Sequence, residues 1–547
     1  MGEKKFRDPI YGYIIVDDEL IDKIVDTATF QRLRDVVQTS YAPLYSSAVH
    51  NRFVHSIGVY HLGKITVQAL LRSFGETSSP LVSTITEYMG IFELACLLHD
   101  VGHAPFSHTG EMLYLKNGER TELHHTLVEL TGDETLEQEI VNNSYKAAPH
   151  EIMSAIIAME AFPDMIHEEK RSFFARCICG YKYANDLDEQ KSILNCMIEL
   201  LNSKIIDVDK LDYLLRDAYM TGFDTVVIDY LRLLESVRFV ENEKHHYEVC
   251  YTKSAVSVIE NVVYAHDAER KWIQTHPTVL YESYIIENVL MDILEKIIHQ
   301  DYLPKALLSE VGVNLQGFGQ IRLMGDSDIR YLMKNLPDGS LCKKYYERRL
   351  RKHPIWKSEA EFQAIFQGSE SELEFIKEEF DSLKDYLRSC GLPFLINDDA
   401  MNTCKFEIDE LKKELEAAGE HGREKTLQSL ETRKEHLQWM QILEEFAKDQ
   451  HISFEFLVIY TNQFNSGFRK QEFGDIKILF PELRQPCKFG EVSNVLKSEK
   501  SRGEKFFFLF YNRDEEQKEI SIMQLVGSML TLAGRLRSEK RAKQRLL

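Results

Sequence analysis

The sequence has few features of a membrane or secreted protein. Its 547 residues contain no run of about 18 apolar residues, and the first ten, MGEKKFRDPI, lack the apolar stretch of a secretory signal. Its nine cysteines are scattered, and only Cys177 and Cys179 stand close together, with no second pair to complete a zinc site. We therefore expect a cytoplasmic protein with reduced thiols and no membrane partner.

The chain also has fewer basic than acidic residues. The chain has 66 Lys and Arg residues against 87 Asp and Glu residues, a net charge of −21. Such a chain repels a phosphate backbone unless its basic residues gather locally, so we do not expect general nucleic-acid binding. Hydrophobic residues make up 44% of the chain, which is enough to build a large buried core.

Helical patterns dominate the first 300 residues. Apolar residues recur every three or four positions in IFELACLLHD and HEIMSAIIAMEAF, which predicts helix after helix. The polar stretch 115–148 weakens this pattern, and we interpret it as a surface insertion or lid. Residues 1–313 are therefore predicted to form one mainly α-helical domain.

Two further regions are predicted after residue 313. Residues 314–450 are charged and helical, and they either pair with another helix or form a solvated arm. Residues 451–547 contain the aromatic and β-branched runs SFEFLVIYT, DIKILF and KFFFLFYN, which predict strands, followed by a helix from Ser521 to Leu536. We expect a helical extension and a small α/β carboxy-terminal domain.

The densest group of reactive side chains is HDVGHAPFSHTGE, residues 99–111, with three histidines, an aspartate and a glutamate. The apolar run before it predicts a buried helix that holds His99 and Asp100 rigidly at its end. Other segments must complete a metal site, because adjacent helical residues point about 100° apart. The sequence offers His55 in HNRFVHSIGV and Asp209 in DVDKLDYLLRDAY. Imidazole and carboxylate ligands together suit manganese, iron, zinc or magnesium, so they do not identify the ion.

Each of these residues also has a structural interpretation. A lone buried histidine is more often a hydrogen-bonded core residue than a ligand, but clustering favours a site. Asp209, Tyr213 and Asp217 are four apart, flanked by Lys210 and Arg216, so this face suits a phosphorylated sugar. A salt-bridged surface helix is the alternative for the segment on its own.

Together these segments resemble a known family. The order His55, then His99 and Asp100, then Asp209 resembles the HD superfamily of metal phosphohydrolases. HNRFVHSIGV, HDVGHAPFSHTGE and DVDKLDYLLRD are similar to HD-domain deoxynucleoside triphosphate triphosphohydrolases, and FRDPIYGYIIV with DTATFQRLRDVVQTS extends the resemblance over about residues 6–300. The resemblance implies an HD-domain helical bundle and a divalent metal ion (Mn, Fe, Mg or Zn) held by those four residues.

The implied reaction cleaves a deoxynucleoside triphosphate between the sugar 5′ oxygen and the α-phosphorus, releasing a deoxynucleoside and inorganic triphosphate. His108 would protonate the leaving oxygen and Glu111 would orient His108. By the same resemblance His103 and His150 would contact the phosphates. The other implied substrate contacts are Arg52, Lys210 and Tyr213 for the triphosphate, Gln38 and Asp217 for the sugar, and His266, Arg270 and Gln274 along the nucleotide.

Three positions depart from the family pattern: aligned on His276, the places of an arginine, a tyrosine and a glutamine are taken here by His266, Gln274 and Thr275. The family has a tyrosine against the sugar where this sequence has Gln274, so we expect weaker exclusion of ribonucleotides. Asp26, Gln31 and Arg34 match part of a regulatory nucleotide site that relatives build at subunit contacts, although an ordinary amphipathic helix would account for them equally well. The match implies a homo-oligomer, a dimer or tetramer, with a nucleotide activator as an open alternative.

Two other functions compete with this interpretation. One is a different HD phosphohydrolase, such as a nucleotidase or a cyclic-nucleotide phosphodiesterase, which would not release inorganic triphosphate. The other is a nucleotide-sensing regulatory module that binds without turnover, against which the full set of ligands and His108 argues. A cellular role in dNTP-pool control or in antiphage defence rests on analogy alone.

Overall fold

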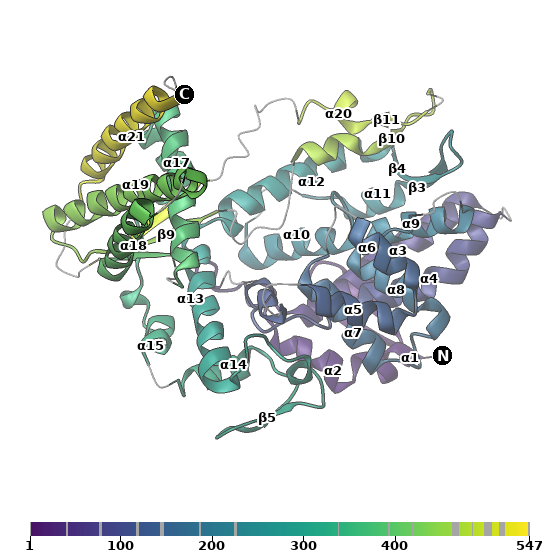
Figure 1. Ribbon diagram of the computed structural model, residues 1–547. Helices are drawn as coiled ribbons and strands as arrows, with labels where there is room; N and C mark the ends of the chain where they lie inside the picture. The colour runs from purple at the N-terminus through teal and green to yellow at the C-terminus, as the bar shows by residue number, and fades with distance from the viewer. Residues whose placement is uncertain are drawn as a thin grey trace. The chain divides into compact units, whose positions relative to one another are not determined.

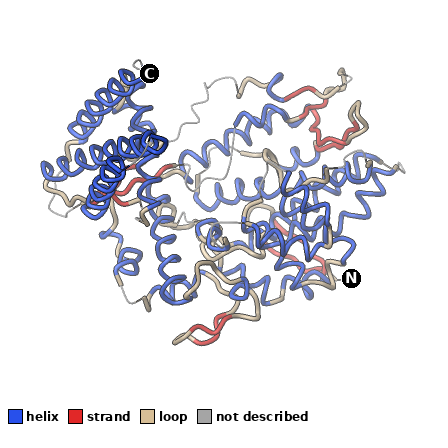
Figure 2. The backbone as a smooth tube through the Cα atoms, viewed as in Figure 1, coloured by secondary structure: helices blue, strands red, loops and turns tan. Residues whose placement is uncertain are grey.

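The computed structural model describes residues 2–39, 42–75, 79–115, 120–142, 147–184, 188–223, 227–336, 339–391, 394–417, 420–461, 470–483, 485–496, 506–513 and 520–544. These residues form two compact units, each assembled from several segments of the chain. Unit 1 comprises Met1–Gln274, Glu282–Cys342 and Ser466–Lys500, and unit 2 comprises Thr275–Tyr281, Lys343–Asn465 and Ser501–Leu547. Helices make up most of both units (Figures 1 and 2), which confirms the mainly α fold.

Unit 1 is built around one buried helix. This helix, α4 (Pro80–Leu98), packs against α3 (Arg52–Phe74), α8 (Glu168–Cys179) and α9 (Glu189–Leu201). Ser79 caps its first turn, and seven residues from Phe92 to Leu98 are buried. The other helices of unit 1 are α1 (Asp18–Leu20), α2 (Ala28–Gln31), α5 (Thr121–Thr131), α6 (Glu134–Asn142), α7 (Pro149–Ala161), α10 (Val208–Thr221), α11 (Tyr230–Glu235), α12 (Val256–Glu269), α14 (Asp326–Met333) and α20 (Phe489–Val492).

Helix α4 is the one described helix long and apolar enough to cross a membrane by length and composition. Half of its apolar window is buried inside unit 1. Buried contacts with three neighbouring helices are what the central helix of a folded core makes, so its apolar composition has a structural explanation.

Unit 1 also contains strands, and of these the sequence patterns predicted only β10. Its amino-terminal hairpin pairs β1 (Glu3–Asp8) with β2 (Gly12–Asp17), and a second small hairpin pairs β5 (Val313–Leu315) with β6 (Gly319–Ile321). A four-stranded sheet has the order β11 (Cys487–Lys488), β10 (Lys477–Leu479), β4 (Tyr247–Thr252), β3 (Val237–Glu241). Strand β10 runs parallel to β4 and the other pairs are antiparallel. The predicted succession of helices from Leu20 to about residue 300 is therefore interrupted by the β3–β4 hairpin.

Unit 2 packs helices against an antiparallel sheet with the order β7 (His353–Pro354), β12 (Phe507–Tyr511), β9 (Glu455–Tyr460), β8 (Leu395–Asn397). Aromatic rings fill its core: Phe380 stacks on Phe507, and the buried Trp356 donates its indole N–H to the Phe507 carbonyl. The helices of unit 2 are α16 (Glu359–Ile365), α17 (Glu370–Ser389), α18 (Asp398–Ala417), α19 (Glu420–Gln450) and α21 (Ile522–Gln544). Helices α13 (Pro277–Ile293) and α15 (Ser340–Tyr346) cross the unit boundaries.

The three runs predicted as strands are strands, although they join different sheets: β9 and β12 lie in unit 2 and β10 lies in unit 1. Helix α21 continues to Gln544 and does not end at Leu536, because Arg537 and Lys540 pair with Glu372 and Glu379 of α17. Residues 115–148 form α5 and α6, while 116–119 and 143–146 lie outside the described residues. The domain boundaries at 313 and 450 stay predictions.

Candidate functional site

Three helices of unit 1 bring the predicted metal ligands together. Helix α3 carries His55, the carboxy-terminal end of α4 presents His99 and Asp100, and the first turn of α10 carries Asp209. Local capping fixes two of these helices. The Asn51 side chain accepts a hydrogen bond from the Val54 N–H at the start of α3, and Asp207 does the same for Lys210 at the start of α10.

The donor atoms of these four residues converge on one point. His55 Nε2 lies 3.2 Å from His99 Nε2 and 3.0 Å from Asp209 Oδ1. The Asp100 carboxylate completes the group, with Oδ2 3.6 Å from His55 Nε2 and Oδ1 3.5 Å from His99 Nε2. Two ligands about 2.1 Å from one ion are roughly 3.0–3.5 Å apart at the usual angles, so this spacing fits a metal ion. His55, His99 and Asp100 are all buried.

Hydrogen bonds at the far side of each imidazole direct its lone pair inward. His55 Nδ1 lies 2.7 Å from Asp212 Oδ2, and His99 Nδ1 lies 2.9 Å from the Cys96 carbonyl oxygen. With Nδ1–H donating to these acceptors, both Nε2 atoms carry lone pairs that face one another and the carboxylates. A metal ion bound among these atoms would relieve this repulsion. The donor set therefore could hold a metal ion.

Asp212 belongs to this site although the sequence did not single it out. Besides His55, it accepts hydrogen bonds from Arg216 and from the Tyr11 hydroxyl. Gly58 on α3 makes room for it, because a Cβ at that position would lie 2.0 Å from Asp212 Oδ1. The only sequence signal was its place three residues after Asp209 on the same helix.

Arg52 forms an ion pair with Asp100 and so does not point freely towards a substrate. Its Nη1 lies 2.7 Å from Asp100 Oδ2, and its Nε donates to the Ser107 hydroxyl at 2.9 Å. Burial alone would raise the pKa of Asp100, but Arg52 and the neighbouring histidines outweigh it and hold that pKa well below its usual range.

A second group of histidines stands beside the first. His103 and His150 stack with their ring centres 4.1 Å apart, and the His108 ring packs edge-on against both. Glu111 accepts a hydrogen bond from His150 Nδ1 and lies 3.7 Å from His108 Nδ1. Glu111 thus contacts His150 more closely than its expected partner His108. The His108 side chain is 58% exposed, whereas His103 is fully buried, 3.5 Å from Asp100 Oδ1.

The loop that carries these histidines is held from outside the motif. Phe106 and Ser107 both have positive φ, a backbone conformation that is unfavourable for residues other than glycine. The Phe106 N–H donates to Asp326 Oδ1 at 2.7 Å, and Arg32 donates to the carbonyl oxygens of Val101 and His103. Asp326 lies more than 200 residues further along the chain, so only the folded structure identifies it.

The predicted phosphate and sugar contacts on α10 are engaged in hydrogen bonds. Lys210 Nζ lies 2.7 Å from Asp207 Oδ2, and the Tyr213 hydroxyl lies 3.0 Å from His266 Nε2. Asp217, near the end of the same helix, lies 2.7 Å from His50 Nε2. The Tyr213 contact brings His266 of α12 against α10.

The remaining predicted substrate residues are also close to this region. The Gln38 N–H donates to the His50 carbonyl, which links it to the partner of Asp217. Gln274 donates from Nε2 to Glu269 Oε1 at 2.8 Å, so one of its amide N–H groups is already engaged. Arg270 Nη2 pairs with Asp267 at 3.3 Å on its own helical segment.

The three residues of the predicted regulatory site lie on neighbouring segments of unit 1. Arg34 Nε donates to Gln31 Oε1 at 2.7 Å, and its guanidinium covers the Phe53 ring. The Asp26 carboxylate pairs with Lys4 of β1 at 3.1 Å. An aromatic-stacked guanidinium and an exposed ion pair have ordinary structural roles, and they are also groups that an anionic ligand could use.

Comparison with known proteins supports the same family. The chain is 28% identical over 340 residues to an uncharacterized protein of Mycoplasma genitalium, covering 61% of this chain and 67% of that protein. It is 32% identical over 250 residues to the deoxynucleoside triphosphate triphosphohydrolase SAMHD1 of Gallus gallus, covering 44% and 38%. It is 25% identical over 312 residues to a putative HD domain-containing protein of Acanthamoeba polyphaga mimivirus, covering 53% and 57%. No family model matches the chain.

The chain spans between about two fifths and two thirds of the length of these curated relatives. A crystal structure of a hypothetical protein from Aquifex aeolicus shares its fold, with a TM-score of 0.50 and 19% identity over 94% of this chain and 97% of that one. The relatives confirm the resemblance to the HD-domain, dNTPase-like family, and the structural likeness extends to the part of the chain beyond residue 300.

Proposed function

We propose that this chain, a relative of the HD-domain, dNTPase-like proteins, hydrolyses deoxynucleoside triphosphates to deoxynucleosides and inorganic triphosphate with a bound divalent metal ion. Its relatives support the broader assignment as an HD phosphohydrolase. The observation that carries the proposal is the convergence of His55, His99, Asp100 and Asp209 within 3.0–3.6 Å beside a second, more exposed histidine group. We further propose that the protein acts in the cytoplasm.

The metal ion would be held by those four side chains, with Asp212 orienting His55. A divalent ion there would supply positive charge and Lewis acidity for attack on a phosphate. Imidazole and carboxylate donors accept manganese, iron, magnesium or zinc, so the donor set leaves the identity of the ion open.

The second histidine group would supply the proton that the leaving 5′ oxygen takes up. His108 is the most exposed of the three histidines, and we assign it the proton that goes to the leaving 5′ oxygen. Glu111 would fix His150 directly and His108 more loosely, which orients both rings for the phosphates. His103, buried between them and Asp100, would contact the same phosphates.

The nucleotide would lie along α10. At about 1.5 Å per helical residue, Asp209 and Asp217 are roughly 12 Å apart, which is about the length of a nucleotide from phosphate to base. Lys210 would then meet the triphosphate, Tyr213 the region between triphosphate and sugar, and Asp217 with Gln38 the sugar hydroxyl. On the opposite wall, His266, Arg270 and Gln274 would border the nucleoside.

Product analysis tests the proposal. The purified protein is incubated with each dNTP and NTP in the presence of manganese, magnesium, iron or zinc, and the products are separated by ion-exchange chromatography. We expect deoxynucleoside and inorganic triphosphate in equal amounts, with dNTPs preferred. Release of single phosphates, or of a nucleoside monophosphate from a cyclic substrate alone, would assign the site to another HD phosphohydrolase.

Two variants separate chemistry from binding. Asp100→Asn should lose both bound metal and turnover, because it weakens a ligand and the Arg52 pair. His108→Ala should keep nucleotide affinity within a few-fold and lower turnover by about 100-fold or more. A His108→Ala protein that turns over normally would show that another group protonates the leaving oxygen.

A further inference from the structure

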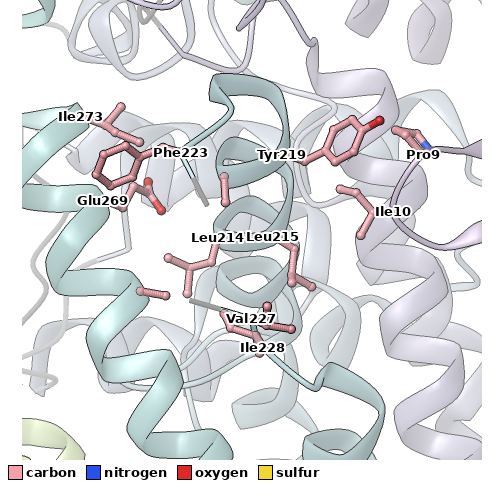
Figure 3. A pocket seen from close by; sticks show the side chains of 12 residues that line it. Pro9, Ile10, Leu214, Leu215, Tyr219, Phe223, Val227, Ile228, Glu269 and Ile273 are labelled. Carbon is pink, nitrogen blue, oxygen red and sulfur yellow. The ribbon is translucent and has the colours of Figure 1, made fainter. Parts of the chain in front are cut away.

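Glu269 joins two residues of the proposed nucleotide site. It ends α12, and Gln274 ends the short helical segment that follows. Its Oε1 accepts the hydrogen bond from Gln274 Nε2 at 2.8 Å. Figure 3 shows the Glu269 carboxyl group turned towards α10, the helix that also carries Asp217. The family resemblance gives roles to Gln274 and Asp217 but none to Glu269.

Asp217 is the second partner of Glu269. The two carboxyl groups share a hydrogen bond, and Asp217 Oδ1 also lies 2.7 Å from His50 Nε2. His50, Asp217 and Glu269 are all buried. With Gln274 they form a continuous chain of polar side chains from the segment before α3, through α10, to the end of α12. Buried polar groups that satisfy one another are held rigidly.

The hydrogen bond between the two carboxyl groups requires a proton. Burial and the nearby Asp217 raise the pKa of Glu269 well above its ordinary value, so Glu269 is the group that holds this proton. A protonated carboxyl group has one O–H donor and still accepts at its other oxygen. Glu269 can therefore donate to Asp217 and accept from Gln274 at the same time, which fixes the separation of those two side chains.

That separation matters for the sugar of a nucleotide. The bond to Glu269 uses one N–H of the Gln274 amide, which has a second N–H and an oxygen to offer a ligand. Asp217 is the proposed partner of the 3′ hydroxyl, and ribose adds a 2′ hydroxyl on the neighbouring carbon. Two polar side chains held at a fixed separation are suited to meeting both hydroxyls.

We propose, on the basis of the proposed function, that Glu269 is a positioning residue that holds Gln274 and Asp217 in place for the two adjacent hydroxyls of a ribose. The site then admits ribonucleotides beside deoxyribonucleotides. Glu269 itself acts through its two partners and does not touch the reacting phosphate.

Binding of paired nucleotides tests this role. Each dNTP and its NTP are titrated by isothermal titration calorimetry into the full-length protein, both metal-free and with calcium, a poor Lewis acid that slows hydrolysis. We expect each NTP to bind within about tenfold of its dNTP. Glu269→Leu frees Gln274, so it should weaken the NTP roughly two- to tenfold more than the dNTP. Its effect through Asp217 should weaken both nucleotides alike.

Further variants show whether Glu269 acts through its hydrogen bonds. The amide of Glu269→Gln accepts from Gln274 and donates to Asp217 as the protonated acid does, so it should keep the wild-type ratio of NTP to dNTP affinity. Gln274→Leu should change that ratio as Glu269→Leu does, and the double variant should change it no further. Glu260→Leu, the same exchange elsewhere on α12, is the control and should keep the ratio.

The outcomes separate this role from the proposed function. If no nucleotide binds to the wild type under either condition, the proposed function fails and this inference fails with it. Suppose instead that nucleotides bind but Glu269→Leu keeps the wild-type ratio, that Glu269→Gln changes it as much as Glu269→Leu, or that the two leucine variants add in full. Glu269 then does not position Gln274, and the proposed function stands.

Thermal unfolding of each variant establishes that it is folded. If Glu269→Leu does not fold, Glu269→Asp takes its place. Its side chain is one methylene shorter and does not span both partners, so the same change in the affinity ratio is expected, and an unchanged ratio would overturn the proposal.

Discussion

At the residue scale, the orientation of His55 depends on a carboxylate that is not itself a ligand. Asp212 fixes the Nδ1–H of His55 and is in turn fixed by Arg216 and Tyr11. Such partners set the tautomer and raise the basicity of the ligating nitrogen, so their loss weakens metal binding even when every ligand remains.

We therefore predict that Asp212→Asn lowers metal affinity by about 10- to 100-fold. The amide keeps the size of the side chain but removes the negative charge that supports His55. Competition with a chelator of known affinity measures the effect. Asp229→Asn, a capping residue at the start of α11, is the control and should bind metal as the wild type does. Wild-type affinity in Asp212→Asn would show that Asp212 stabilises Arg216 and Tyr11 but not the metal site.

Glu93 on α4 is a buried acid outside the site. It is 8% exposed, and burial raises its pKa from 4.5 to about 7. Because the folded protein holds this proton more tightly than the unfolded chain, the stabilisation is complete below pH 4.5 and is lost as the pH rises through about 7. Glu93 should therefore make the protein less stable at pH 8 than at pH 5.

We predict that Glu93→Gln removes this dependence. Relative to wild type, the variant should gain roughly 1–3 kcal/mol of unfolding free energy at pH 8 compared with pH 5. Chemical denaturation at the two pH values measures it. The control is Glu87→Gln, at an exposed position on the same helix. It should change the unfolding free energy by the same amount at pH 5 and at pH 8. If Glu93→Gln also changes the unfolding free energy equally at the two pH values, the pKa of Glu93 is not raised.

Residues differ in how well the sequence predicts them. The motif at 99–111 with His55 and Asp209 predicted a group that the structure brings together, because each residue stands in a short, dense pattern. Asp212 and Asp326 were missed for physical reasons. An acid inside a helix with a nearby arginine looks like a solvated ion pair, and a contact across more than 200 residues leaves no local pattern.

At the scale of elements, one buried arginine forms ion pairs that hold α5 and α6 against the core of unit 1. Arg176 of α8 is fully buried and its Nη2 lies 2.9 Å from Asp133 Oδ2, with Glu139 of α6 as a second partner. These two helices form the stretch interpreted as an insertion or lid. These ion pairs add to the packing of α5 against α7 and α8.

We predict that Arg176→Met frees α5 and α6 without unfolding unit 1. Removing one partner of a buried ion pair costs about 3–5 kcal/mol, because Asp133 and Glu139 are left uncompensated. Hydrogen–deuterium exchange should accelerate in residues 121–142 and stay unchanged in α4.

The comparison variant for Arg176 is Lys170→Met, which removes an exposed pair from the same helix and should leave exchange in 121–142 unaltered. Uniformly faster exchange across unit 1 in Arg176→Met would mean that the insertion folds together with the core.

Elements were predictable where periodicity was strong. Long helices such as α4 and α7 follow the 3.6-residue pattern, and β9 and β12 follow from their aromatic, β-branched runs. The hairpin of β3 and β4 was missed because its charged turn, ENEKHH, divides two short runs that resemble helix ends. The end of α21 was misplaced because ion pairs, not apolar periodicity, extend it.

At the scale of the molecule, the predicted regulatory residues concern assembly. If Asp26, Gln31 and Arg34 form a nucleotide site at a subunit contact, the oligomer should change with nucleotide. We predict a dimer or tetramer whose mass or population shifts on adding dNTPs, measured by light scattering, with turnover sigmoidal in dNTP concentration. Arg34→Ala should abolish the shift and keep the metal. A monomer with hyperbolic kinetics under all conditions would exclude it.

The interleaving of the two units has a consequence for synthesis of the chain. Strand β10 completes the unit 1 sheet by pairing with β4, yet about 225 residues separate them and most of unit 2 lies in between. During translation at about 5–20 residues per second, the edge of β4 would stay open for roughly 11–45 seconds. An open edge is a template for wrong pairing, so the slower this chain is synthesised, the longer its β4 edge is exposed to mispairing before the native sheet can form.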